Sequence, residues 1–398
     1  MEFSKLLKEP RIIFPIAILA GFECFMQTGV YRQFLRPDTY AYNVNRIRHI
    51  VRESSVKPNV LIIGTSVPYQ GIQLPLLNRL TAADGLVFQS GATEGAMIET
   101  QYALYQDLVK AQPQVRSIVL VGDIALPWKS RYQLEWVNRS MVAQFPRTRI
   151  WPLLQELEFD LSLRDQTFFI FRTLTYQADL RDLILKPLYR IKKIGREERA
   201  QSHDYPHHND SPYSLARIGV TSTGAGLVDL QKCVETAMRP ELRQDSQGLV
   251  YDENGRHVSD EHQRKATAQT CEQARTESWL LSQPGLEWQE LYFRRLQKFI
   301  DAIHSDGREV VVIYPPYARI VNFLNSDERI LVWDQNLDRI CADKACPRLD
   351  TRDRLQGKDS LDYFYDVLHL NAHGADEWTR ELARRFHPLA SFLRGQGP

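Results

Sequence analysis

Short, unbroken hydrophobic runs alternate along this chain with longer segments whose apolar residues recur at helical spacing. The short runs cover 60–63, 86–88, 117–121 and 309–314. Continuous apolar runs of this length indicate strands covered on both faces, as in a parallel sheet. Helical spacing appears from Trp288 to Ile303 and again from Ala375 to Leu389. Strands separated by helices predict an α/β fold.

The most apolar stretch near the start, residues 12–31, predicts a transmembrane anchor. Its apolar core, from Ile12 to Val30, has nineteen residues, which as a helix span roughly 28 Å, close to a hydrocarbon core of about 30 Å. Residues 1–11 carry Lys5, Lys8 and Arg11, which favours a cytoplasmic tail. The main domain is then expected in the periplasm or another extracytoplasmic space. Residues 32–57 follow as a polar connecting helix.

Glu23 and Gln27 interrupt this apolar stretch. A carboxylate at the centre of a bilayer costs about 2.5 kcal/mol or more, so Glu23 requires an explanation. It either faces another membrane protein's helices or lies near the outer interface of a marginal anchor. A third interpretation makes the segment a buried helix of a soluble protein.

The two halves of the predicted sheet domain are 58–126 and 285–398. The intervening residues, 127–284, lack the strand and helix rhythm. Their first part is helical and apolar in patches, and their second part, from about 195, is polar and rich in His, Asp, Ser and Gly. We interpret 127–284 as an insertion over the active-site end of the sheet that serves as a lid, substrate platform or partner surface.

Composition narrows the classes of function. Apolar residues make up 43% and charged residues 25% of the chain, as in ordinary folded proteins. The net charge of +1 argues against nucleic acid as the main partner. Outside the apolar stretch there are four cysteines, and their nearest-neighbour pairing is Cys233 with Cys271 and Cys341 with Cys346. Disulfides and free thiols both remain open.

The first motif with chemical meaning is GTSVPYQGI, from Gly64 to Ile72. Ser66 follows a buried strand and precedes a helix, at the sheet edge where α/β folds bind ligands. Free N–H groups at a helix start favour developing negative charge, which suits a nucleophilic serine. The alternative is that Thr65 and Ser66 only cap the helix.

The second motif is DVLHLNAHG, from Asp366 to Gly374. An aspartate three residues before a histidine can hold one imidazole nitrogen and leave the other free as a base. We therefore predict that Ser66, His369 and Asp366 form a catalytic triad. The alternative is a helix cap beside a surface histidine.

Together, the GxS and DxxHLNxxG blocks resemble the SGNH/GDSL hydrolase superfamily. Within it, the chain is most similar to membrane-anchored bacterial members, such as DltD-like and polysaccharide O-acetylation proteins. The resemblance implies a flavodoxin-like, three-layer α/β domain and cleavage or transfer of an ester acyl group, with no metal and no cofactor. It also implies an oxyanion hole made by the backbone N–H groups of Ser66 and Gly91. The third donor of the family, an asparagine, corresponds to the position of Asp123, where a carboxylate would repel the oxyanion.

Three further features need interpretation. YPPY, Tyr314 to Tyr317, ends a strand; Tyr314 and Tyr317 are predicted to line the substrate cleft, or else the prolines simply end the strand. The segment SHDYPHHND, 202–210, lacks regular ligand spacing and indicates a solvated loop rather than a metal site. The basic run over 186–196 suits an ordinary solvated helix face or a surface resting on anionic lipid.

These observations support an extracytoplasmic serine esterase or O-acyltransferase acting on acyl esters, acetyl above all, of a cell-envelope polysaccharide. Its expected partners are that polymer or an acyl donor, the membrane, and a membrane-bound O-acyltransferase contacting the anchor. The alternative is a non-catalytic accessory protein of such an acyltransferase or of a polysaccharide export complex.

Overall fold

The computed structural model describes residues 10–37, 39–200, 204–212, 214–216, 243–244, 250–251, 286–318, 327–342, 345–355, 360–366 and 368–396. The chain divides into two compact units. The first combines Met1–His49 with Tyr132–Gln201, and the second combines Ile50–Arg131 with Ser202–Pro398. The predicted insertion, 127–284, is thus divided between the two units.

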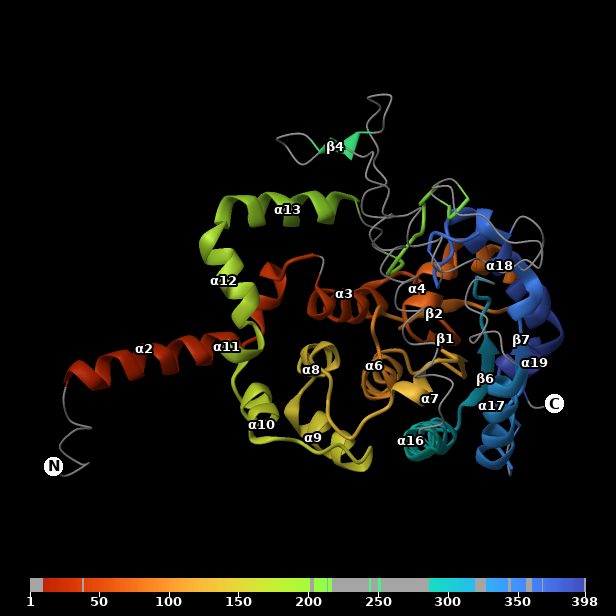
Figure 1. The fold of residues 1–398 in the computed structure, drawn as a ribbon, viewed down its shortest axis with the longest axis horizontal. Coiled ribbons are helices and arrows are strands. Elements are labelled where there is room, and N and C mark those ends of the chain that lie inside the picture. Colours follow the sequence, from red (N-terminus) through yellow and green to blue (C-terminus); the bar gives the residue numbers. More distant parts are fainter. Residues whose placement is uncertain are drawn as a thin grey trace. The chain divides into compact units, whose positions relative to one another are not determined.

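The second unit contains a five-stranded, all-parallel sheet (Figure 1). Its strands are β1 (Val60–Ile63), β2 (Phe88–Ser90), β3 (Ser117–Val121), β6 (Glu309–Tyr314) and β7 (Arg348–Asp350). Their spatial order is β2-β1-β3-β6-β7. This is the doubly wound order in which the second strand flanks the first, and it leaves a ligand-binding crevice at the carboxyl ends. The predicted α/β class is confirmed.

Helices cover both faces of this sheet. On one face α18 (Ala372–Phe386) packs against α4 (Ser66–Gly71) and α5 (Leu74–Leu80), and Phe386 stacks on Phe88 of β2. On the other, α16 (Leu286–Ser305) packs against α6 (Ile98–Ala111) and α17 (Asp327–Ile340). The remaining elements of this unit are short: η2 (Ala82–Asp84), α7 (Leu126–Lys129), β4 (Arg243–Gln244), β5 (Val250–Tyr251), η4 (Arg352–Leu355), η5 (Ser360–Asp362), η6 (His387–Leu389) and α19 (Ala390–Leu393).

The first unit is helical. Its elements are α2 (Pro10–Gln27), η1 (Val30–Phe34), α8 (Trp136–Val142), α9 (Arg147–Glu156), α10 (Leu163–Ile170), α11 (Arg172–Thr175), α12 (Gln177–Leu185) and α13 (Pro187–Ala200). The boundary with the second unit falls inside α3 (Tyr40–Glu53), which is the predicted connecting helix.

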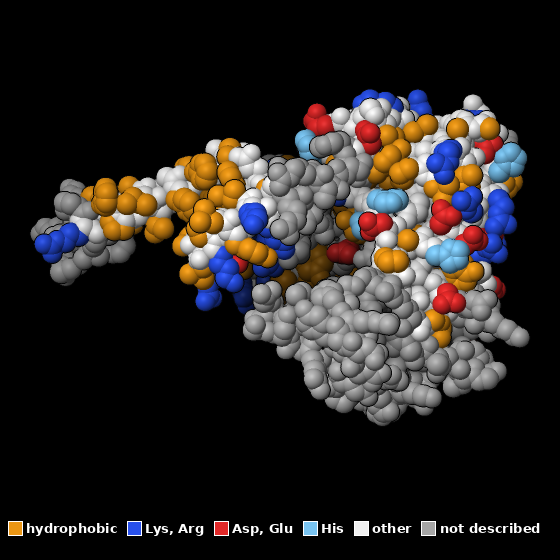
Figure 2. Space-filling view, turned by 90° about the horizontal axis from the view of Figure 1, so that it is seen from above, with side chains coloured by type: hydrophobic (Ala, Val, Ile, Leu, Met, Phe, Trp, Pro, Cys, Tyr) orange, Lys and Arg blue, Asp and Glu red, His pale blue; other side chains and the backbone are white. Residues whose placement is uncertain are grey.

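Helix α2 covers most of the predicted anchor, 12–31. Its hydrophobic side chains are largely exposed, and Figure 2 shows them along the visible face of this helix. The exposed residues are Ile13, Phe14, Ile16, Ile18, Leu19, Phe22 and Phe25. Among the described residues, none of the helices has both the length and the apolar character needed to cross a bilayer.

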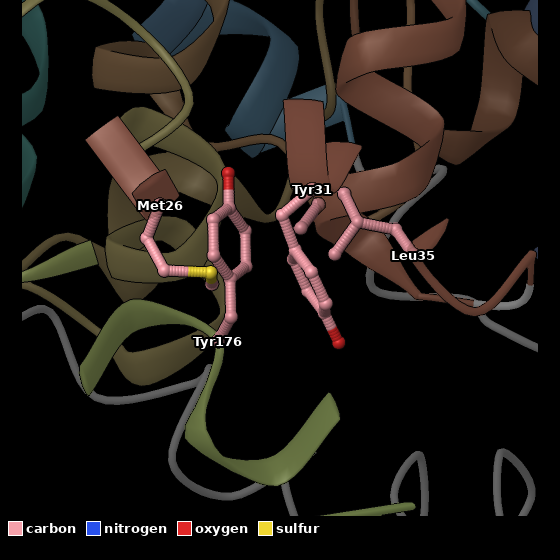
Figure 3. Close-up of a cluster of buried hydrophobic side chains, with 5 residues drawn as sticks. Met26, Tyr31, Leu35 and Tyr176 are labelled. Carbon is pink, nitrogen blue, oxygen red and sulfur yellow. The ribbon is translucent and has the colours of Figure 1, made fainter. Parts of the chain in front are cut away.

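A small hydrophobic cluster joins the end of α2 to the helices that follow it (Figure 3). Met26, Tyr31 and Leu35 pack with Ala41 and Tyr176, and each is nearly inaccessible to solvent. The rings of Tyr31 and Tyr176 lie 5.2 Å apart between centroids. This cluster ties the chain leaving α2 to the start of α12.

Candidate active site

Ser66 is the first residue of α4, three residues beyond the end of β1. Thr65 caps this helix, because its side-chain oxygen accepts a hydrogen bond from the Val67 N–H at 3.3 Å. The turn needs Gly64, since a Cβ there would lie 2.5 Å from Cγ of Pro68. Thr65 therefore performs the capping, and the Ser66 hydroxyl is left for another contact.

His369 and Asp366 lie on the loop that enters α18, and His369 meets Ser66 across 303 residues of sequence. His369 Nε2 lies 2.7 Å from Ser66 Oγ. His369 Nδ1 lies 2.8 Å from Asp366 Oδ2. The three predicted triad residues therefore form one continuous chain of hydrogen bonds. Ser66 and His369 are half-buried, whereas Asp366 is buried with 4% of its surface exposed.

The loop carrying the histidine is held by its own backbone. The N–H groups of Leu368 and His369 both donate to Asp366 Oδ1 at 2.8 Å. Asn371 caps α18 by accepting from the Gly374 N–H at 2.9 Å. Gly374 is required because a Cβ there would lie 2.1 Å from the Tyr363 carbonyl oxygen. The asparagine and glycine of the HLNxxG motif thus fix the turn that positions His369.

Electrostatics favour a charged aspartate beside the histidine. Burial alone would raise the pKa of Asp366, but His369 and the backbone N–H groups outweigh it, so the pKa lies below its ordinary value. Burial alone would lower the pKa of His369, but the Asp366 carboxylate outweighs it, and the pKa is raised. Glu94 and Asp123 raise it further. An orienting carboxylate with a nearby basic imidazole is the pairing that general-base catalysis uses.

Of the two predicted oxyanion donors, the Ser66 N–H is available and the Gly91 N–H is not. Ser66 begins α4, so its N–H has no acceptor within its own helix. The Gly91 N–H donates instead to the Ile62 carbonyl oxygen at 2.8 Å, as a rung between β2 and β1. The prediction for Gly91 is therefore wrong. Glycine is needed there for packing, because a Cβ would lie 2.7 Å from Leu108 Cδ1 and 2.8 Å from Ile63 Cδ1.

Asp123, at the end of β3, carries an acceptor rather than a donor into the site. Its Oδ1 accepts from the Ala125 N–H at 3.0 Å and from the Tyr317 hydroxyl at 3.5 Å. Burial, and then Asp123, raise the pKa of Tyr317 well above its usual value, so this hydroxyl stays protonated as a donor. Asp123 thus holds a fixed carboxylate near His369.

The two tyrosines of YPPY do not line a cleft, which corrects the prediction for both. Tyr314 and Tyr317 are each only 1% exposed. The Tyr314 hydroxyl donates to Asp334 on α17 at 2.8 Å, and its ring packs against Trp333. Tyr317 meets the site through its hydrogen bond to Asp123. Both side chains point into the core because the strand ends beneath α16 and α17.

The sequence predicted a solvated loop over 202–210, but the described residues around it, 204–212 and 214–216, are packed beside the triad. Asn209 is only 8% exposed, and its Nδ2 donates to the Gln70 carbonyl at 3.0 Å and to the Leu370 carbonyl at 2.8 Å. Gln70 belongs to the helix of Ser66, and Leu370 follows His369. Asn209 therefore bridges the two motifs. The sequence around Asn209 mixes polar and apolar residues without periodicity, so its pattern does not predict that Asn209 is buried.

Other contacts of this segment fix it in place. His207 stacks on Tyr69 of α4 with 4.3 Å between ring centroids. The Ser211 carbonyl accepts from the Ala372 N–H at 2.9 Å, at the start of α18. Gln73 Nε2 donates to the Asn209 carbonyl at 2.6 Å. We call residues 204–212 and 214–216 the strap, since they join α4 to the His369 loop.

The remaining sequence candidates lie away from the triad. Cys341 and Cys346 are free thiols within hydrogen-bonding reach of each other, and Cys24 is free and exposed. Cys233 and Cys271 lie outside the described residues. In the described part of the chain, no group of three His, Cys, Asp or Glu side chains is placed to hold a metal ion.

Comparisons with protein-family models and with curated proteins returned no match to this chain.

Proposed function

We propose that this chain is a serine esterase or O-acyltransferase that works through an acyl-enzyme on Ser66. The observation that carries the proposal is the chain of hydrogen bonds from Ser66 through His369 to Asp366, with distances of 2.7 and 2.8 Å. A nucleophile, a base and an orienting carboxylate within hydrogen-bond reach form the arrangement that acyl transfer requires. The doubly wound strand order and the SGNH-like motifs also support it.

In the proposed reaction, Ser66 Oγ attacks the carbonyl carbon of an ester while His369 Nε2 takes the hydroxyl proton. The Asp366 carboxylate stabilises the imidazolium that forms. The Ser66 N–H faces the oxygen that becomes negative. Collapse of the tetrahedral intermediate breaks the ester bond, and the leaving alcohol takes the proton from His369. Water or a sugar hydroxyl then accepts the acyl group by the same steps in reverse.

We place this activity on acyl esters, acetyl above all, of a cell-envelope polysaccharide, with the catalytic unit outside the cytoplasm. The motif resemblance supports this substrate class. Membrane anchoring through α2 is supported by its exposed hydrophobic side chains, because a helix that is apolar all round needs an apolar environment. A membrane-bound O-acyltransferase contacting α2 is the proposed protein partner.

The test is labelling with a fluorophosphonate probe and hydrolysis of a chromogenic acetyl ester by the full chain in detergent. Wild type should be labelled, and Ser66→Ala should lose both labelling and turnover. Ser391→Ala, an exposed serine on α19, is the matched control and should behave as wild type. Equal labelling of wild type and Ser66→Ala would exclude Ser66 as the nucleophile.

A second candidate is a non-catalytic accessory protein of an acyltransferase or export complex. The observation favouring it is the weak oxyanion site: the Gly91 N–H is used within the sheet, and Asp123 presents a carboxylate. Loss of one oxyanion donor costs about 10²–10³ in turnover in a well-studied protease. Polymer acetylation restored in cells by Ser66→Ala, but not by a chain lacking α2, would favour this candidate.

A further inference from the structure

Helices α12 and α13 present a row of exposed hydrophobic side chains. Leu188 is 82% exposed, which is high for a leucine on a folded helix. Its companions are also mostly exposed, and together they are Ile184, Leu185, Leu188, Tyr189 and Ile191. A contiguous apolar surface of this kind usually marks a contact with a partner or a membrane.

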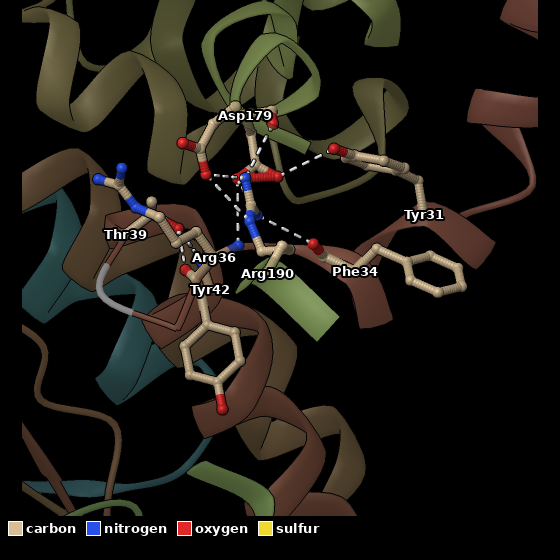
Figure 4. A network of polar contacts seen from close by, with 8 residues as sticks. Tyr31, Phe34, Arg36, Thr39, Tyr42, Asp179 and Arg190 are labelled. Carbon is tan, nitrogen blue, oxygen red and sulfur yellow. Dashed lines mark hydrogen bonds and ion pairs between the residues drawn. The ribbon is translucent and has the colours of Figure 1, made fainter. Parts of the chain in front are cut away.

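Arg190 explains why these side chains point outward. It is only 1% exposed and forms ion pairs with Asp179 at 2.6 Å and Asp182 at 2.8 Å (Figure 4). Its Nη1 also donates to the Phe34 carbonyl at 3.1 Å, and the Tyr31 hydroxyl donates to Asp179 at 3.0 Å. Because Arg190 occupies the inner side of α13, the helical period turns Leu188 and Ile191 away from it.

Basic side chains accompany this apolar row. Lys186 lies at the junction of the two helices, Lys192 lies one residue beyond Ile191, and both are exposed, as is Arg181 on α12. Lysine stems can lie along an apolar surface while their ammonium groups reach anionic headgroups. Helices that lie in a membrane interface typically combine leucine and isoleucine with flanking lysines and a nearby tyrosine, as here.

The same surface continues toward the proposed membrane helix. Glu23 of α2 accepts hydrogen bonds from the Arg172 N–H at 2.7 Å and the Thr173 N–H at 2.9 Å, so α11 is attached to α2. The carboxylate within the apolar stretch is thereby engaged inside the chain. Leu174 of α11 then shares an open recess of about 500 Å³ with residues of α12, namely Gln177, Leu180, Arg181, Ile184 and Leu185.

We propose that α12 and α13 lie on the surface of an anionic phospholipid bilayer, with the hydrophobic row in the headgroup boundary and the lysines on lipid phosphates. The inference rests on the membrane-anchoring part of the proposed function and is independent of Ser66. A bilayer fits better than a protein groove because positive charge and apolar surface lie side by side on two helices joined at an angle. That surface matches the charge and depth of an anionic interface.

The test uses the full chain reconstituted into nanodiscs of phosphatidylcholine alone or with about one quarter phosphatidylglycerol. Hydroxyl-radical footprinting would measure oxidation of Leu188, Tyr189 and Ile191. We expect oxidation to fall at least about fivefold in the anionic discs, and to recover when salt screens the lysines. Leu331, an exposed leucine of the catalytic unit, is the internal control and should not change.

The double variant Lys186→Gln with Lys192→Gln removes both positive charges. It should shift the equilibrium between the lipid-bound and lipid-free states of α12 and α13 by about 30-fold toward the lipid-free state, since each lysine near an anionic surface contributes about fivefold. Lys110→Gln is the matched control. Equal oxidation in both kinds of disc, or failure of the chain to co-elute with anionic discs, would overturn the inference, as would protection that appears only with an added membrane protein. Failure to co-elute with phosphatidylcholine discs alone would count against the anchor and leave the lipid surface standing.

Discussion

Removing the Asn209 side chain should loosen the catalytic site without touching a triad residue. Asn209 Nδ2 makes two hydrogen bonds, to the carbonyls of Gln70 and Leu370 at 3.0 and 2.8 Å. Each contributes about 1 kcal/mol net, so Asn209→Ala should lower the free energy of unfolding by about 2 kcal/mol. Asn209→Asp should cost more, because it places a carboxylate against two carbonyl oxygens.

The effect on activity follows from geometry. The strap joins the helix of Ser66 to the loop of His369, whose contact at 2.7 Å leaves little tolerance. A displacement of about 1 Å in a catalytic group can lower the rate about 10²-fold. We therefore expect Asn209→Ala to reduce kcat by about 10- to 100-fold at temperatures where the protein is still folded, with a smaller effect on KM.

Urea unfolding would measure the stability, and fluorophosphonate labelling and ester hydrolysis would measure the activity. Asp210→Ala is the matched control, since Asp210 is the exposed neighbour on the same strap and should change neither quantity by much. Full labelling rate in a destabilised Asn209→Ala would refute the positioning role. Unchanged stability would refute the assigned hydrogen bonds.

Three more predictions concern charge. Activity should be lost as pH falls through the raised pKa of His369, because only the neutral imidazole accepts the Ser66 proton. Asp366→Asn removes the carboxylate that raises this pKa, so the acid limb of the pH–rate profile should move to lower pH. The same substitution should reduce kcat by about 10⁴. Asp123→Asn places an amide donor where the SGNH/GDSL family has its asparagine, and it should raise kcat of ester hydrolysis at least about tenfold; a fall would show that the carboxylate has a role of its own. Arg190→Met leaves two carboxylates without their partner and should lower stability by about 3 kcal/mol in thermal or urea unfolding, whereas Arg181→Met, on the exposed side of α12, should change it by about 0.5 kcal/mol or less.

Local sequence was enough for strands β1, β3 and β6 and for the two motifs, whereas β2, Phe88–Ser90, begins two residues later than the apolar run 86–88 that predicted it. Strands β1, β3 and β6 have the bounds that their apolar runs predict, because a strand covered on both faces leaves an unbroken hydrophobic signal. Strand β7, Arg348–Asp350, gave no such signal, since it is a short and partly exposed edge strand whose place depends on pairing with β6. The pairing of Asp366 with His369 is local, so three-residue spacing and a following helix cap sufficed to suggest it.

Tertiary structure decided what stands around that pair. Sequence could name Ser66 as a candidate, but the packing of α18 against α4 and α5 brings His369 to it. The direction of a side chain at a strand end depends on which helix covers it, and so Tyr314 and Tyr317 are core residues. Tertiary structure also decided the role of Gly91, because its N–H donates to a carbonyl of the neighbouring strand β1. The burial of Asn209 arises from contacts with two segments distant in sequence, and no periodic pattern records contacts of that kind.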